Sequence, residues 1–455
     1  MSTLLIKNGR IMDPVNKTDR VANLFVRDGK IVSVTEEEPA ADTVVDASGK
    51  LVTPGFIDIH MHESAIPEGS DQVPPYIERS MLLMGVTSCF GGNCGDAYGD
   101  PAELLDFYDE HGCYINMGLF AGHSYIRSKC GGTDKYAPVS AEVLEAMKKQ
   151  AQAYLDAGCM GISFGVKYIP GTTWEEMVEL SKLVVPSGRL VTAHIRNDCV
   201  NDMDAIDEMR RLSEDTGCRV EVSHIGSMAA YGHMDEFLRH YDDARAAGVD
   251  MQADCYPYNA FSTAIGATTF DDYSLKNYNY NYGAIQIVDG ENAGKRCTKE
   301  IFDWERANHP EHLCIGFFMN PDEIVMAMTH EGVMLGSDGL RAGLQGHPRA
   351  AGAFPRLISE YVKTGKVTLE HALEMMVSMP RERLGLENKG VFNAGADADI
   401  LIWDYDRMKD MATFDEPNLG AEGIDYVFIG GEIAAKDGEV VNSKLGRSIR
   451  FKEKK

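Results

Sequence analysis

One short stretch, GFIDIHMH at residues 55–62, constrains this chain more than any other segment. A strand turns successive side chains to opposite faces, so Asp58, His60 and His62 would share one face. Two imidazoles on one face can bind the same metal ion. A single histidine there would be an ordinary core residue. A His-x-His pair after Pro-Gly-Phe-Ile-Asp, with further candidate ligands downstream, predicts a metal site instead.

Residues 54–386 alternate short apolar runs with helical stretches. The predicted strands are the runs at 55–62, 86–93, 115–122, 160–166, 190–195, 219–225, 249–258 and 332–339. One of the helices between them, at 140–158, begins at Ser140 as a candidate cap and stops at Ala-Gly. Eight βα units predict an α/β fold, a (β/α)8 TIM-like barrel, whose catalytic groups gather at the carboxyl ends of the strands.

The two ends of the chain have a different texture. Residues 1–53 and 387–455 carry short apolar runs, and Asn-Gly, Asp-Gly and Ser-Gly turn pairs break the first of these regions. We expect both ends to build one small β-sandwich beside the barrel, and the basic tail at 443–455 to be a solvated terminus. Residues 267–310 are aromatic, polar and poorly periodic, which predicts an excursion over the barrel mouth.

Charge and composition exclude several kinds of partner. The net charge of −26 argues against nucleic acid and anionic membrane surfaces, because both require basic patches. Apolar runs fall well short of the ~20 residues that span a bilayer, and the N-terminus does not resemble a signal peptide. The ten cysteines form no C-x-x-C pair, so most are expected to be buried and reduced. We therefore expect a cytoplasmic protein, and a homo-oligomer is compatible with these features.

Polar residues stand at or just beyond the carboxyl ends of the predicted strands. They are His60, His62, Cys94, Lys167, His194, His224 and Asp338. Any one of them alone has an ordinary structural explanation, such as a core histidine or a turn aspartate. Because the carboxyl ends of barrel strands meet on one side, their joint occurrence predicts a shared metal site there.

The chain resembles the amidohydrolase superfamily and, within it, the N-acyl-D-amino-acid deacylases (D-aminoacylases). The resemblance covers nearly the whole chain and is carried by specific motifs. These are PGFIDIHMH, GNCG, GHSYIR at 122–127, HIRN, the Ser-His pair before residue 225, DCYPY at 254–258, MLGSDG followed by HPR and FPR, and the late run ADADILIWD. It implies a barrel with a β domain split between the two ends.

The resemblance also implies roles for the strand-end residues. Cys94, His194 and His224 would hold one tight metal ion, zinc, which a thiolate and two imidazoles suit. His60, His62 and Asp338 would surround a second, weaker position. Asp338 would act as general base on metal-activated water, whose pKa falls to ~7, and return the proton to the leaving amine. His123 or Tyr256 would help to stabilise the oxyanion.

Lys167 departs from the pattern of the D-aminoacylases. Dihydroorotases and hydantoinases, elsewhere in the superfamily, use a carboxylated lysine to bridge two metals. Two alternatives are open. Lys167 is either an N6-carboxylysine in a binuclear centre or an unmodified lysine that pairs with a carboxylate in the mouth, because a charged amine next to zinc would be repelled.

A second departure concerns the cation that binds the substrate's carboxylate. Arg349 matches a family arginine that holds this group, with help from Tyr256 or Tyr258. Two residues after His224, however, the family has a lysine and this chain has Gly226. Residues that could replace that lysine are Arg127, Arg196, Arg341 and an unmodified Lys167.

The leading hypothesis is zinc-dependent hydrolysis of the amide bond of N-acyl amino acids, of D configuration. The substrate would be a small amide that bears a carboxylate. The first alternative is a cyclic amide hydrolase, like a dihydroorotase or hydantoinase, with carboxylated Lys167. An inactive barrel kept as a binding protein is a third reading, disfavoured because every expected ligand position is present.

Overall fold

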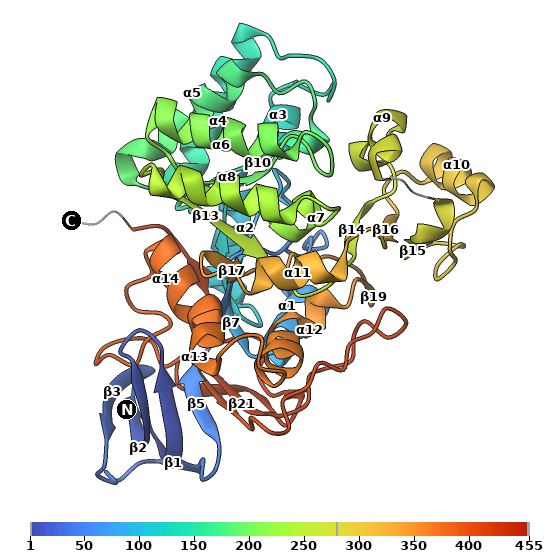
Figure 1. Ribbon diagram of the computed structural model, residues 1–455. Helices are drawn as coiled ribbons and strands as arrows, with labels where there is room; N and C mark the ends of the chain where they lie inside the picture. The colour runs from blue at the N-terminus through green and yellow to red at the C-terminus, as the bar shows by residue number, and fades with distance from the viewer. Residues whose placement is uncertain (1, 279–280, 453–455) are drawn as a thin grey trace.

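The computed structural model describes residues 2–278 and 281–452 and has an α/β architecture (Figure 1). The strands predicted from the sequence between residues 55 and 339 are all present. They are β6 (Phe56–Asp58), β7 (Val86–Gly91), β8 (Asn116–Leu119), β10 (Gly161–Gly165), β11 (Leu190–His194), β12 (Arg219–Val222), β13 (Met251–Cys255) and β17 (Val333–Leu335), with a short β9 (Ala121–Gly122) before β10. Apolar runs bounded by turns and helices therefore identified the strands correctly.

These strands pair in parallel in two sheets. One has the order β17-β13-β12-β11-β10-β9, and the other the order β24-β8-β7-β6, where β24 is Ser448–Ile449. Two contacts join the sheets: a parallel bridge between Met61 and Gly339, and a 2.8 Å hydrogen bond from the Met160 amide to the Leu119 carbonyl. Because all these strands run the same way, their carboxyl ends face one side of the molecule.

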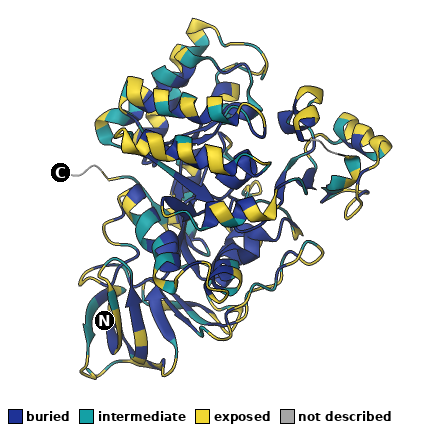
Figure 2. Cartoon of the chain, in the orientation of Figure 1, coloured by how far each residue is buried: buried dark blue, intermediate teal, exposed yellow. Residues whose placement is uncertain are grey.

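Helices follow most of the strands and cover them on the outside. They are α1 (Ile77–Leu83), α2 (Pro101–His111), α3 (His123–Lys129), α4 (Ala141–Ala157), α5 (Trp174–Val184), α6 (Asp202–Thr216), α7 (Ile225–Ala229), α8 (Met234–Ala246), α11 (Pro321–Met328), α12 (Arg349–Arg356), α13 (Leu369–Leu373) and α14 (Met379–Leu384). Figure 2 shows exposed stripes on the outer helices and buried strands beneath them. The predicted cap is confirmed: Ser140 accepts a hydrogen bond from the Val143 amide, and Gly158 ends α4 in a left-handed conformation.

The two ends of the chain meet in one sheet. Within the described residues this sheet has nine strands, in the order β23-β22-β21-β20-β5-β1-β2-β3 with β4 beside β1. The N-terminal strands are β1 (Thr3–Asp13), β2 (Thr18–Arg27), β3 (Lys30–Thr35), β4 (Thr43–Asp46) and β5 (Leu51–Pro54). The C-terminal strands are β20 (Ile400–Trp403), β21 (Ile424–Ile429), β22 (Glu432–Lys436) and β23 (Glu439–Val440). β20 pairs with β5, so the ends are joined by backbone hydrogen bonds as well as by packing.

The prediction of a solvated tail is wrong for residues 446–451. β24 pairs in parallel with β8, and the Phe451 amide donates to the Gly158 carbonyl. Ile449 and Phe451 pack against a buried apolar cluster that includes Ile57 and Phe120. The basic side chains made this segment look like a surface terminus. Its alternating Ile449 and Phe451 fill space between strands that only the tertiary structure brings together.

A second correction concerns the opening motif. β6 ends at Asp58, so His60 and His62 lie beyond the strand. Their backbone nevertheless stays tied to the segment after β17, because the Asp338 amide donates to the His60 carbonyl and the His62 amide to the Gly339 carbonyl. The two histidines therefore remain on the carboxyl side of the parallel strands.

An excursion leaves the parallel strands after β13 and returns before α11. It comprises residues 261–316, with β14 (Phe261–Ala264), β15 (Ile285–Ile287), β16 (Leu313–Gly316), α9 (Asp272–Leu275) and α10 (Lys299–Asn308). Its strands form a separate antiparallel sheet in the order β14-β16-β15, which stands apart from the parallel strands in Figure 1. Beyond it, the short pair β18 (Arg341–Ala342) and β19 (Gln345–Gly346) precedes α12. No helix of the described residues combines the length and the apolar character that crossing a membrane requires.

Candidate metal centre

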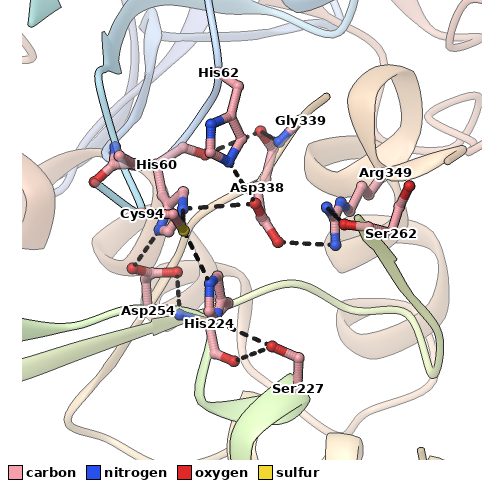
Figure 3. Close-up of polar contacts among 12 residues, drawn as sticks. His60, His62, Cys94, His224, Ser227, Asp254, Ser262, Asp338, Gly339 and Arg349 are labelled. Carbon is pink, nitrogen blue, oxygen red and sulfur yellow. Dashed lines mark hydrogen bonds and ion pairs between the residues drawn. The ribbon is translucent and has the colours of Figure 1, made fainter. Parts of the chain in front are cut away.

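The carboxyl side of the parallel strands brings together most of the predicted site residues. Figure 3 shows His60, His62, Cys94, His224 and Asp338 pointing toward one another. They come from the segments after β6, β7, β12 and β17, and His194 joins them from the last position of β11. All of these side chains are buried. Segments up to about 280 residues apart in sequence thus converge on one small volume.

Two overlapping groups of ligand atoms share the Cys94 thiol. The first comprises Cys94, His194 and His224, and the second comprises His60, His62, Cys94 and Asp338. Within each group the ligand atoms all lie within 4.8 Å of one another. Cys94 Sγ lies 3.2 Å from His224 Nε2 and 3.5 Å from His60 Nε2. These distances are short enough for one ion to contact several of the atoms at once.

The backbone at three of these residues has an unusual conformation. Cys94, His224 and Asp338 have φ angles of 54°, 35° and 49°, in the left-handed region that side chains rarely adopt. Such conformations cost of order 1–3 kcal/mol each and persist where the surroundings impose them. Gly165 permits the turn at Cys94, because a Cβ there would lie 1.9 Å from the Cys94 carbonyl oxygen. Each of these turns directs a side chain into the centre.

The electrostatics of the centre favour a thiolate. Burial alone would raise the pKa of the Cys94 thiol, but the imidazoles of His224 and His60 hold it well below its ordinary value. Burial alone would lower the pKa of His62, yet hydrogen bonds with Asp338 and Cys94 raise it to about 10. Burial and the neighbouring His224 lower the pKa of His194, which keeps that ring neutral. A thiolate beside a neutral imidazole is the donor state that a metal ion requires.

His194 supplies the clearest indication of a missing partner. Within residues 2–278 and 281–452, neither of its buried ring nitrogens makes a hydrogen bond of regular geometry, and the Cys94 thiol is its polar neighbour in the centre. An unsatisfied buried polar group costs about 1–3 kcal/mol. Coordination of a metal by one nitrogen would remove part of this cost. One thiolate and two imidazoles from Cys94, His194 and His224 match the N/S donors that zinc prefers, so the residues present fit a zinc ion.

Two further residues orient the histidines, and the sequence analysis assigned no role to either. Asp254 Oδ2 lies 3.1 Å from His60 Nδ1, and its Oδ1 accepts the His224 backbone amide at 2.9 Å. Ser227 Oγ lies 3.0 Å from His224 Nδ1. With their Nδ1 atoms engaged, both rings present Nε2 to the centre. A carboxylate at the end of a strand, here in DCYPY, is the signal that could have identified Asp254.

Asp338 is held on both of its oxygens. His62 Nε2 lies 3.2 Å from Oδ1, and the Arg349 guanidinium lies 2.8 Å from Oδ2. Arg349 is fully buried, packs 4.6 Å over the Tyr256 ring and donates to the Ser262 carbonyl. Burial would raise the pKa of Asp338, but Arg349 above all holds it well below the ordinary value. Asp338 therefore stays ionised.

A pocket opens beside these residues. It is lined by Tyr168, His194, Asp198, His224, Ser227, Met228, Phe261, Ser262, Thr263, Thr269 and Asp338. His194, His224 and Asp338 face it from the centre, and Phe261 and Thr269 face it from the excursion. A small molecule in this pocket would contact candidate metal ligands and the candidate base at the same time.

Several residues predicted to bind substrate make other contacts. His123 Nε2 lies 2.7 Å from Glu176 Oε1, in a buried pair. Arg127 donates to the carbonyls of residues 132, 134 and 137. Tyr258 donates to Asp410 at 2.6 Å. All three stabilise the surrounding fold, which gives each an ordinary structural role.

Besides Arg127, the other two arginines considered as replacement cations, Arg196 and Arg341, are also engaged elsewhere. Arg196 contacts Glu208 and donates to the Thr172 carbonyl. Arg341 donates to Asn418 and to the Pro417 carbonyl. Sequence proximity to the strand ends suggested both residues. Their guanidinium groups form hydrogen bonds with nearby loops and helices.

Lys167 pairs with Asp198, which lines the pocket. Its Nζ donates to Asp198 Oδ1 at 2.6 Å and to Ser274 Oγ at 3.2 Å, and the Lys167 and Asp198 side chains are each 5% exposed. This ion pair corresponds to the second of the two alternatives for Lys167. A Cβ at Gly226 would lie 2.7 Å from Ile324 Cδ1 and 2.9 Å from Cys255 Sγ, so a side chain there would require these two side chains to shift.

Comparison with known proteins agrees with this geometry. Residues 51–434 match the model of the amidohydrolase family. The chain belongs to the amidohydrolase family. It is 30% identical to N-acyl-D-glutamate deacylase of Alcaligenes xylosoxydans xylosoxydans, with 94% of this chain and 92% of the relative covered. It is 28% identical to the D-aminoacylase of the same organism, over 98% of this chain and 97% of the relative.

A solved structure of a similar amidohydrolase contains zinc. It is the N-acyl-D-glutamate deacylase from Bordetella bronchiseptica, complexed with zinc and a phosphonate inhibitor that mimics the tetrahedral intermediate. This chain superimposes on it with a TM-score of 0.88 at 30% identity, covering 98% of this chain and 99% of that one. The fold around the candidate centre is thus shared with a zinc-bound relative.

Asp254 provides a test of the centre in this amidohydrolase. Asn in its place has one acceptor oxygen, so it cannot serve both His60 Nδ1 and the His224 amide. We expect Asp254→Asn to weaken zinc binding about 10–100-fold, measured by competition with a chromophoric chelator. Asp235→Asn, on the exposed face of α8, is the control and should bind as the unmodified chain does. Equal affinity in both variants would remove Asp254 from the centre.

Proposed function

We propose that this amidohydrolase is a zinc-dependent deacylase that cleaves the amide bond of N-acyl-D-amino acids. The observation that carries the proposal is that the donors Cys94, His194 and His224 and the carboxylate of Asp338 border one pocket. Similarity over nearly the full length to an N-acyl-D-glutamate deacylase and a D-aminoacylase supports this reaction. The zinc complex of the related deacylase supports the choice of metal.

We infer that the two parallel sheets close into a single (β/α)8 barrel over residues 54–386. The Met61–Gly339 bridge and the Met160–Leu119 hydrogen bond support closure at the two junctions. The nine-stranded sheet described above supports a β-sandwich made from residues 1–53 and 387–455. The pocket contact of Thr269 supports a mouth-covering role for residues 267–310.

All ten cysteines lie in the described part of the chain and are unpaired, which supports a reducing, cytoplasmic location.

The residues of the centre divide the chemistry among them. When bound by Cys94, His194 and His224, zinc polarises the amide carbonyl and acidifies a water molecule. Asp338 Oδ1 accepts a proton from the attacking water and later donates it to the departing amine nitrogen. His62 fixes this carboxylate, and Arg349 keeps it ionised until it takes the proton. His60 and His62 complete the weaker metal position with Asp338.

The geometry suggests two roles for Arg349. Its guanidinium, 2.8 Å from Asp338 Oδ2, holds the base, and its position behind the pocket suits the predicted grip on the substrate's carboxylate. Tyr256, under the guanidinium, restricts its movement. One buried arginine would then couple substrate recognition to the state of the base.

Lys167 bears on the alternative of a cyclic amide hydrolase. That reading requires a carboxylated lysine between two metals. The ion pair with Asp198 supports an unmodified lysine that is not a metal ligand. Lys167 would also affect the charge of the pocket wall, because its partner Asp198 lines the pocket.

The proposed reaction is tested with a panel of amides. Zinc-loaded protein should release free amino acid from N-acetyl-D-amino acids and leave the L-enantiomers intact, as measured by chiral chromatography. Asp338→Asn should lower kcat about 10²–10⁴-fold, because a general base contributes that much, and should retain zinc. Opening of dihydroorotate or hydantoins without deacylation would support the alternative instead. No turnover of any amide by zinc-loaded protein would contradict both readings.

Arg349 is tested through pH dependence. Its guanidinium lowers the pKa of Asp338, so the base is available down to low pH. Without that cation the pKa of Asp338 rises, and the acid limb of the kcat/KM profile should move to higher pH in Arg349→Gln. KM should also rise. Arg219→Gln, whose partner is Asp250 on the surface, is the control. An unmoved acid limb with an unchanged KM would exclude both roles.

Lys167 is tested by metal content. If it is an unmodified lysine, Lys167→Met should bind as many zinc ions as the unmodified chain, and bicarbonate should not change that number. A bridging carbamate would instead be lost with the lysine, together with one of two metals. Lys135→Met serves as control, because it removes an amine that donates to the carbonyl of Gly266 in the excursion. The measurement is elemental analysis after removal of loosely bound ions.

A further inference from the structure

A second group of metal-ligating side chains lies in the excursion, outside the active centre. Its sequence is His309-Pro-Glu-His312, between α10 and β16. The His312 amide donates to the His309 carbonyl at 3.0 Å, which closes a four-residue turn. Proline is favoured at the second position of such turns because its φ is preset. The turn brings the first and last side chains, both histidines, to the same side.

The side chains of this turn are arranged as a set of donors. The imidazoles of His309 and His312 stack with their centroids 4.4 Å apart and their planes 7° from parallel. Because an imidazole binds a metal in its ring plane, the more exposed His309 ring would turn out of this stack to share an ion with His312. His309 Nδ1 lies 3.5 Å from Glu311 Oε1. One ligand atom from each of His309, Glu311 and His312 lies within 4.8 Å of the other two. Two neutral imidazoles and a carboxylate are a donor set that zinc and neighbouring divalent transition metals accept.

A buried carboxylate orients one of the two rings. His312 Nδ1 lies 2.9 Å from Glu305 Oε2, and Glu305, in α10, is fully buried. The other oxygen of Glu305 accepts from Asn292 at 2.7 Å, so the carboxylate is held in place. An N–H donated from Nδ1 to Glu305 leaves the Nε2 lone pair free. Carboxylate support of this kind is typical of histidines that bind metals.

The surroundings also favour a cation. Asp289, Glu305 and Glu311 all lie close to His312 or to its turn, and the chain as a whole carries a net charge of −26. Gly290 makes room for the His312 ring, because a Cβ there would lie 2.3 Å from Cε1. The ring is therefore confined on one side by backbone and on the other by His309.

We propose that His309, Glu311 and His312 bind a divalent transition-metal ion such as zinc, at a site separate from the active centre. The turn is connected to the pocket wall by the backbone. The carbonyls of Pro310 and His312 accept the amides of Gly266 and Ile265, each at 2.8 Å. That segment continues directly into Thr263 and Thr269, which line the pocket. An ion bound at the turn stiffens this wall of the pocket.

The test compares zinc stoichiometries by competition with a chromophoric chelator. The unmodified chain should bind one zinc ion more than His309→Ala. His309 is 40% exposed in its side chain and has no role in the buried pair with Glu305, so the variant should fold. Glu311→Gln, with a 69% exposed side chain, should weaken the same ion. The test uses the difference in zinc stoichiometry between the unmodified chain and His309→Ala, so the outcome does not depend on whether the active centre is loaded.

His371→Ala is the matched control. His371 also pairs with a nearby carboxylate, Glu374 at 3.1 Å; its side chain is 22% exposed, against 40% for His309, and its site offers a single imidazole. It should keep the full zinc stoichiometry. Equal stoichiometry in the unmodified chain and His309→Ala overturns the proposal. A loss of one ion in His371→Ala as well overturns it too, because the binding would then be a general property of surface histidines.

Hydrogen exchange tests the proposed effect on the pocket wall. Zinc added beyond the amount that loads the active centre should slow amide exchange in residues 263–269 of the unmodified chain. It should not do so in His309→Ala. Equal slowing in both chains would assign the effect to the active centre and contradict the connection described here.

Discussion

The structure depends on one arrangement, a buried thiol surrounded by imidazoles. Cys94 lies within reach of His60, His194 and His224, and all four side chains are buried. Several polar donors in such a volume are costly unless they share a charge or an ion. The left-handed backbone at Cys94 and His224 adds to this cost. A metal ion compensates for both, because it binds the thiolate and imidazoles that the backbone forces together.

The parallel strands supply the rigidity that this arrangement needs. Each candidate ligand follows or ends a strand that is hydrogen-bonded to its neighbours, so the sheets fix the backbone from which these side chains project. Asp254 extends this rigidity from β13, since its two oxygens fix a ring of one ligand and the backbone of another. Arg349 does the same for Asp338. Contacts behind the site, such as those of Asp254 and Arg349, therefore position the side chains of the centre.

Periodicity and turn signals identified the parallel strands between residues 55 and 339 and the capped helix after Ser140. The candidate ligands followed, because carboxyl ends of parallel strands must meet. Pattern alone could not separate a substrate-binding arginine from one that caps a loop. Arg127 and Arg196 look alike in sequence, and only their partners show that both are engaged in local contacts. Asp254 was overlooked because its role depends on distances to residues 30 and 194 positions away.

The sequence by itself determined the class of fold, the family and the candidate donors, since these depend on local period and on motif residues such as His60, His62 and Cys94. Tertiary structure decided how those donors share one thiol, which carboxylate holds each ring, and that Lys167 pairs with Asp198. It also paired Ser448 and Ile449 of the basic tail with β8. These outcomes depend on distances between segments far apart in the chain. Local sequence patterns predict the strands and helices, but the distances between remote segments are set only when the whole chain has folded.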